Sequence, residues 1–339
     1  MIETVLGPIE AASLGVASMH DHLLIDARIL HAPAREPLPE DPRVTLENLG
    51  FVRWNLLALE DNLVLDDAAL AASELARAGA EGQRAVVDPT CWGLGAAYER
   101  LPAIARASGL HVVAGCGVYL DRPHPERVAR ADEGALADEF LRALTVSLPG
   151  VDFRAGLLGL IGTSEPVTGG ERKALRAAGR AAGRTGAAVL VRLDPAARRG
   201  PWVLDELAAV GCPPAQVIFG NVDEFMEPAY LRELAAAGAT LEVCFGNEAY
   251  YRDGYGDPPD GARLDGIEEL LGEGLAGQLV LGCSVWTKSQ LRAYGGMGYE
   301  HLLRRIVPAL RKRGVGEAQL DLMLVDNPRR LLDRPPVVA

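Results

Sequence analysis

The chain has 339 residues, of which 49% are hydrophobic and 24% charged, so it can bury a sizeable core. Its formal net charge is −12, and a negative surface repels phosphate backbones and anionic lipids, so we expect neither a nucleic-acid nor a membrane partner. The N-terminus lacks the basic and apolar segments of a signal peptide. Five cysteines without a CxxC spacing favour reduced thiols. These features indicate a soluble, cytoplasmic protein.

Short apolar runs typical of buried strands alternate along the chain with Ala-rich stretches of helical periodicity. Helix starts follow acidic residues such as Asp66 and Asp67, and glycines such as Gly79 and Gly238 mark helix ends. The apolar runs cover residues 15–19, 84–88, 112–118, 156–161, 187–193, 216–219, 240–243 and 279–283. This alternation without a Pro/Gly/Ser linker predicts an α/β fold, a single (β/α)8 TIM barrel over residues 1–339, with a short N-terminal β extension and C-terminal helices.

Side chains at the C-terminal ends of the strands face the mouth of such a barrel. His20 and His22 close the first run, and because residues two apart on a strand point the same way, we expect both imidazoles in the mouth. That arrangement suits a metal ion. The segment 247–260 is rich in Tyr, Gly and Asp, and we expect it to form a rim loop. Other side chains at strand ends are candidates for substrate binding: Asp88, Trp92, Tyr119, Glu165, Cys244 and Trp286.

Several segments together resemble the phosphotriesterase-related family of the amidohydrolase superfamily. They are TVLGPI, LGVASMHDHLLID, VVDPT, HVVAGCGVY, AGLLGLIGTSE, QVIFGNVDE, LVLGCSVWTKSQLRAYGGMGY and DNPRRLL. The resemblance implies a metal-dependent hydrolase of esters, lactones or phosphotriesters, with two metal ions at the barrel mouth. It implies that His20 and His22 bind the first ion, that a strand-four lysine or glutamate bridges both ions, and that further histidines and an aspartate complete the site. It is also compatible with a homodimer.

The sequence departs from this ligand pattern on four strands. It has Gly159-Leu160 in place of the bridging group, Arg192 and Asn221 in place of the two further histidines, and Ser284 in place of the aspartate. Two imidazoles alone leave too few ligands for tight zinc binding, and a guanidinium repels a dication. We therefore expect no cofactor, with zinc bound through His20 and His22 at low occupancy as the alternative.

Three functions remain open from the sequence. The first is a metal-poor acid/base enzyme, such as a lyase, isomerase or cyclase, acting on a small carbonyl- or carboxylate-containing metabolite. In it His20 and His22 transfer protons, Arg192 holds an anion or oxyanion, and Asn221 and Ser284 supply neutral hydrogen bonds. The second is a metal-dependent hydrolase with substitute ligands. The third is an inactive barrel that binds a ligand or a protein partner. The alternative role for Arg192 is a salt bridge to Asp194, Asp223 or Asp88.

Overall fold

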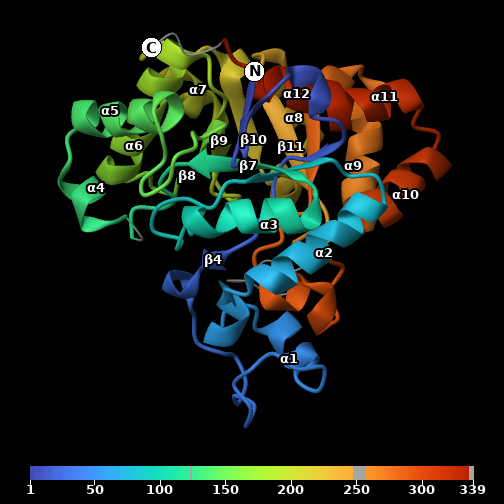
Figure 1. Ribbon diagram of the computed structural model, residues 1–339. Coiled ribbons are helices and arrows are strands. Elements are labelled where there is room, and N and C mark those ends of the chain that lie inside the picture. The colour runs from blue at the N-terminus through green and yellow to red at the C-terminus, as the bar shows by residue number, and fades with distance from the viewer. Residues whose placement is uncertain (123, 247–256, 336–339) are drawn as a thin grey trace.

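Eight parallel strands surrounded by helices form the centre of the computed structural model, which describes residues 1–122, 124–246 and 257–335 (Figure 1). Each strand pairs with the next along the chain, from β3 to β12. The strands are β3 (Ala17–Ser18), β6 (Ala85–Asp88), β7 (His111–Cys116), β8 (Leu157–Gly162), β9 (Val189–Arg192), β10 (Val217–Gly220), β11 (Thr240–Cys244) and β12 (Leu279–Gly282). Each coincides with one of the predicted apolar runs, which confirms the TIM-barrel prediction.

Backbone hydrogen bonds between the first and last strands bring the barrel close to closure. The Met19 N–H donates to the carbonyl of Leu281 at 2.9 Å, and the Ser284 N–H donates to the carbonyl of His20 at 2.7 Å. Gly282 permits this approach, because a Cβ at that position would lie 3.0 Å from both the backbone nitrogen and the carbonyl oxygen of His20. The residues after β3 and β12 therefore meet at the mouth of the barrel.

The helices cover the outside of the barrel with their apolar faces inward, as expected for helices that pack on a buried parallel sheet (Figure 1). None of the helices in the described ranges is both long and apolar enough to cross a bilayer. The helices are α1 (Leu49–Trp54), α2 (Ala68–Ala80), α3 (Leu101–Ser108), α4 (Glu126–Arg130), α5 (Glu133–Thr145), α6 (Gly169–Thr185), α7 (Gly200–Ala208), α8 (Pro228–Ala236), α9 (Asp260–Gly272), α10 (Val307–Lys312), α11 (Glu317–Asp321) and α12 (Asn327–Leu332).

Two small antiparallel sheets complete the fold. β1 (Ile2–Thr4) and β2 (Gly7–Ile9) form the N-terminal hairpin, and β4 (Ile25–Asp26) pairs with β5 (Val64–Leu65). The excursion between β4 and β5 lies below the barrel in Figure 1, against the segment that follows β12. The Lys288 ammonium contacts the Asp61 carboxylate at 2.6 Å, and the Ser289 N–H donates to Asn62 at 2.9 Å. These contacts fix one wall of the mouth.

Candidate active site

The pocket in the barrel mouth has a polar floor and a largely apolar wall, and its empty volume is about 460 Å³ with the opening included. His20 and His22 lie on its floor, and both are at least 96% buried, with exposed fractions of 1% and 4%. Asp21 between them points away and accepts hydrogen bonds from the Ser18 hydroxyl and the Val285 N–H. The pocket is lined by His20, His22, Ile25, Ala27, Leu30, Leu94, Tyr119, Leu160, Arg192, Asn221, Glu224, Ser284 and Trp286.

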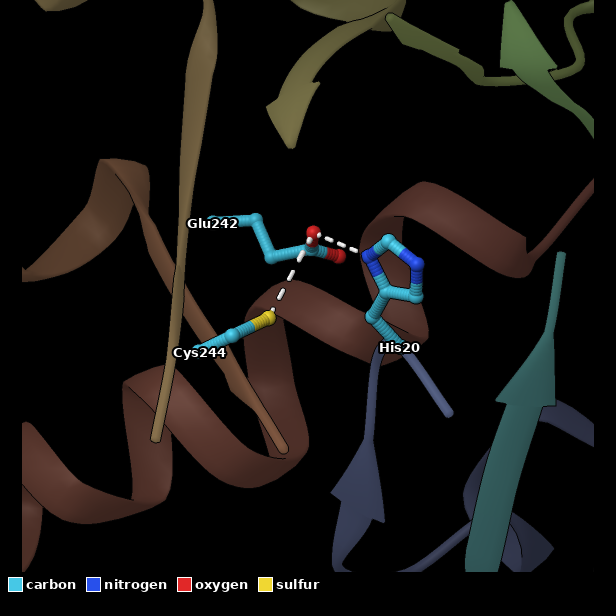
Figure 2. A group of neighbouring side chains, drawn as sticks. All are labelled: His20, Glu242 and Cys244. Atoms are coloured by element: carbon cyan, nitrogen blue, oxygen red, sulfur yellow. Dashed lines mark hydrogen bonds and ion pairs between the residues drawn. The ribbon is translucent and has the colours of Figure 1, made fainter. Parts of the chain in front are cut away.

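A glutamate on β11 orients the first imidazole. Glu242 is fully buried, and its Oε2 lies 2.8 Å from Nδ1 of His20. Cys244 is two residues further along the same strand and therefore on the same face, with its Sγ 3.8 Å from the same oxygen (Figure 2). The sequence analysis did not find Glu242, although one acidic residue inside the apolar strand TLEVC was a usable signal. A buried carboxyl beside a histidine is a common way to fix the tautomer of a catalytic ring.

Hydrogen-bonding distances extend from this pair across the floor of the pocket. Nε2 of His20 lies 3.2 Å from Nε2 of His22, and Nδ1 of His22 lies 2.8 Å from Oγ1 of Thr90. The Thr90 hydroxyl in turn donates to Asp88 Oδ1. Asp88 is buried beneath the floor, outside the set of residues that line the pocket. The sequence predicted that Asp88 contacts the substrate. In the structure its carboxylate instead accepts hydrogen bonds from the backbone N–H groups of Leu23 and Thr90.

Burial controls the protonation of the hydrogen-bonded side chains that run from Glu242 to Asp88. Desolvation raises the pKa of Glu242 to about 8 and that of Asp88 to about 6. Desolvation, with a smaller contribution from the Arg192 charge, lowers the pKa of His20 to about 3, and burial also lowers the pKa of His22. At neutral pH Glu242 is thus a carboxylic acid, both rings are neutral and Asp88 is mostly ionised. In that state every hydrogen bond from Glu242 through the two rings and Thr90 to Asp88 has one donor and one acceptor.

Arg192, at the end of β9, forms an ion pair inside the pocket. Its Nη2 lies 2.7 Å and 2.5 Å from the two carboxylate oxygens of Glu224, in the turn after β10. The Glu224 side chain is 2% exposed and that of Arg192 is 13% exposed. The sequence analysis considered Asp194, Asp223 and Asp88 as partners, whereas the structure shows an ion pair with Glu224. Asp223, by contrast, pairs with Arg263 at 3.2 Å.

Asn221 directly follows the sixth barrel strand, Ser284 lies two residues after the eighth, and both line the pocket. Their φ angles, 52° and 48°, lie in the left-handed region that few non-glycine residues adopt. Such strained positions concentrate at functional sites. The Asn221 N–H points toward Glu242 Oε2 at 3.4 Å, so this backbone contributes to holding the acid in place.

The remaining predicted substrate contacts divide into two groups. Tyr119 and Trp286 line the pocket, and Cys244 lies behind it beside Glu242. Trp92 instead stacks on Phe140 with ring centroids 5.5 Å apart and lies outside the pocket lining. Glu165 lies on the surface, where it binds Arg199 at 2.7 Å. Substrate roles for these two are revised because their side chains have structural partners elsewhere. The predicted rim loop, 247–260, falls mostly outside the described residues.

A model of the phosphotriesterase family matches residues 1–332, almost the whole chain. The chain belongs to the phosphotriesterase family. The N-acetyltaurine hydrolase of Tetraodon nigroviridis is 31% identical over 340 residues, which cover 98% of this chain and 97% of the relative. The human N-acetyltaurine hydrolase is 28% identical with the same coverage. These family members are hydrolases by name, and the comparisons give no support to a lyase, an isomerase or a cyclase.

Solved structures of the phosphotriesterase family and its relatives superpose over the full barrel. A resiniferatoxin-binding protein from Rhodobacter sphaeroides matches with a TM-score of 0.94 and 36% identity, covering 98% of this chain and 94% of its own. The phosphotriesterase homology protein from Escherichia coli, solved with phosphate in its active site, matches with a TM-score of 0.79 and 27% identity, covering 95% of this chain and 99% of its own.

The residues of this pocket do not fit the two-metal centre that the phosphotriesterase family implies. A guanidinium, an amide and a hydroxyl stand at three of the expected ligand positions, and Arg192 lines the same pocket as His20 and His22, where its charge disfavours a dication. The structure offers one other ligand group within its described ranges: the ligand atoms of His20, Glu242 and Cys244 lie within 4.8 Å of one another. Burial raises the pKa of the Cys244 thiol well above its usual value, so an ion at this position would have to displace protons from both the thiol and Glu242.

Proposed function

We propose that this protein hydrolyses an acyl bond, in an ester, lactone or amide, of a small molecule held in the barrel mouth, and that its own side chains supply the acid–base chemistry. The observation that carries the proposal is the 2.8 Å contact between Glu242 and Nδ1 of His20, beside an arginine in the same pocket. A carboxylate that holds Nδ1–H of an imidazole leaves Nε2 as a base.

His20 serves as general base and then as general acid. When Glu242 is ionised, the ring proton of His20 is on Nδ1 and is donated to the carboxylate, instead of on Nε2 as in the neutral-pH state. Nε2 then takes a proton from the attacking water as the water oxygen bonds to the acyl carbon. The protonated ring then donates to the departing oxygen or nitrogen as the acyl bond breaks, and the base is regenerated. His22 lies within 3.2 Å of this nitrogen, and we assign it the role of orienting the water or sharing its proton.

Arg192 stabilises the negative charge that develops on the acyl oxygen. After the larger effect of burial, its charge lowers the pKa of His20, so the guanidinium acts on the same ring that takes the proton. A fixed cation aimed at a developing oxyanion in a dry pocket is a large source of catalysis. Asn221 and Ser284 supply neutral hydrogen-bonding groups at the same mouth.

The comparisons support hydrolysis of an acyl bond. N-acetyltaurine hydrolase acts, by its name, on an N-acyl compound, and this relative spans the same length as the chain. The Escherichia coli protein was solved with phosphate in its own active site, which supports the expectation that the mouth of a barrel of this family stabilises negative charge during a reaction. We extend only the reaction class to this chain.

The test is turnover of a panel of p-nitrophenyl esters, lactones and N-acetyl amines by the wild type, His20→Gln and Arg192→Met. We expect activity toward at least one class and a loss of about 100-fold or more in kcat/KM for either variant. Glu227→Gln, which removes a surface carboxylate that pairs with Arg198, is the matched control and should retain activity. Turnover unchanged in both pocket variants would overturn the proposal.

A binding role is the second candidate, favoured by the similarity to the resiniferatoxin-binding protein over nearly the whole of both chains. It predicts saturable binding of an apolar ligand in the pocket without turnover of any member of the panel. Binding followed by quenching of Trp286 fluorescence, with Trp286→Phe as the control, distinguishes the two functions.

A further inference from the structure

We propose that Glu224 makes the pocket selective for uncharged substrates by occupying the guanidinium of Arg192. This inference rests on the proposed function and names the substrate class: a molecule with an acyl bond, an apolar body and no free carboxylate or phosphate. Glu224 lines the pocket and is 2% exposed, so its charge belongs to the pocket interior.

The first support is the geometry of the ion pair. Both carboxylate oxygens of Glu224 lie within 2.7 Å of Nη2 of Arg192, so an anion that approaches this part of the guanidinium must displace an anion already bound there. The pair is close to electrically neutral as a whole. An incoming carboxylate therefore meets like-charge repulsion from Glu224 as well as the cost of leaving water.

The second support is the composition of the rest of the pocket. Its wall is built from aliphatic side chains, namely Ile25, Ala27, Leu30, Leu94 and Leu160, with Trp286 and Tyr119 at the same mouth. A permanent charge placed against this wall has no partner and is strongly disfavoured. An apolar group gains free energy by leaving water there.

Arg192 can stabilise an oxyanion while Glu224 disfavours an anionic substrate, because the two effects act at different ends of the ion pair. In the proposed mechanism the reacting oxygen is held beside His20, which lines the same pocket as Arg192. We place the body of the substrate along the aliphatic wall and beside Glu224, which line the same pocket. A charge that develops during the reaction is thus stabilised, whereas a permanent charge elsewhere in the substrate is rejected.

The experiment uses a matched pair of ligands that differ only in a terminal charge. Dissociation constants of 4-phenylbutyramide and 4-phenylbutyrate are measured by Trp286 fluorescence and calorimetry, a readout that needs no turnover. In parallel, kcat/KM is compared for p-nitrophenyl butyrate and the p-nitrophenyl monoester of succinate. We expect the wild type to favour the uncharged member of each pair by about tenfold or more.

Three variants decide the role of Glu224. In Glu224→Gln, the ratio of the two dissociation constants and the ratio of the two kcat/KM values should each shift toward the anion by about tenfold. The reason is that the guanidinium can then donate hydrogen bonds to the ligand carboxylate. Glu224→Asp keeps the charge and should keep the wild-type preference, and Glu227→Gln removes a nearby surface charge as the control. Equal binding of both ligands by the wild type, or ratios unchanged in a folded Glu224→Gln protein, would overturn the inference. Selective binding without ester turnover would leave this selectivity standing while contradicting the proposed hydrolysis.

Discussion

Glu242 is buried on a barrel strand, where removal from water makes its ionisation costly. Its Oε2 contacts His20, and its Oε1 has no hydrogen-bond partner among the described residues. A carboxyl in this setting changes protonation near the pH at which an enzyme works. Above neutral pH, the activity of the pocket should therefore depend on pH through Glu242.

We predict that kcat/KM for an uncharged ester rises with pH around an apparent pKa of about 8, because His20 becomes an effective base only when Glu242 is ionised. Glu242→Gln cannot ionise, so it should lose this rise and about 100-fold of the activity at pH 9. The measurement is a pH–rate profile of both proteins, with Glu227→Gln as the control. A Glu242→Gln profile that still rises through pH 8 would assign the titration to another group.

The Arg192–Glu224 pair should contribute to stability as a unit. Arg192→Met removes the guanidinium that pairs with the buried Glu224 carboxylate, and we expect the free energy of unfolding to fall by about 3 kcal/mol. The double variant Arg192→Met with Glu224→Gln removes both charges and should cost less than the single change. Urea denaturation at constant m-value checks this coupling. Costs that simply add would show that the two side chains do not interact in solution.

At the scale of the strands, the fold could be predicted from the sequence but the partners of the site residues could not. Buried parallel strands are continuous apolar runs, so their number and order are visible in the chain. Which inward side chain meets which depends on how the barrel closes. The contact of Glu242 with His20, 222 positions earlier, follows from that closure, and Glu224 reaches Arg192 only because the turn after β10 directs it back.

Gly159 on β8 lies so close to β9 that no side chain fits at this position without a shift of the backbone. Its φ is +154°, and a Cβ there would lie 2.7 Å from Cβ and 3.1 Å from the carbonyl oxygen of Leu190 on β9. We predict that Gly159→Ala lowers the free energy of unfolding by about 2 kcal/mol. Gly169→Ala is the control, because a Cβ there meets nothing within 4 Å. Equal thermal stabilities of the two variants would show that β8 and β9 adjust easily at this position.

Metal binding is a property of the whole barrel, since any set of ligands must come from several strands. The described pocket brings together too few anionic ligands and places Arg192 beside them. We predict that protein purified with zinc or manganese present retains well under one equivalent of either metal, and that chelation by EDTA leaves its activity unchanged. Elemental analysis and assays before and after chelation check both expectations. A stoichiometric ion that is lost in Glu242→Gln would instead establish His20, Glu242 and Cys244 as a metal site.

Buried carboxyl groups also shape the stability of the whole molecule. Desolvation raises the pKa of Asp21 to about 8, as it does for Glu242, far above the value of 3.8 that an aspartate has in an unfolded chain. Between these values the folded protein holds protons that the unfolded chain releases, so stability falls as pH rises from about 4 to 8. Carboxylates whose pKa arginine partners lower, such as Glu133 and Glu206, contribute stability that is lost only on acidification.

We therefore predict a lower free energy of unfolding at pH 8 than at pH 5.5, by about 1 kcal/mol or more. Asp21→Asn cannot ionise, so it should reduce this dependence, while Glu317→Gln, which removes an exposed carboxylate paired with Arg311, should not. Urea denaturation of the three proteins across this range measures the slope. A stability that rises toward pH 8 would mean that the buried carboxyls remain ionised, and it would remove the protonated Glu242 on which the predicted pH–rate profile depends.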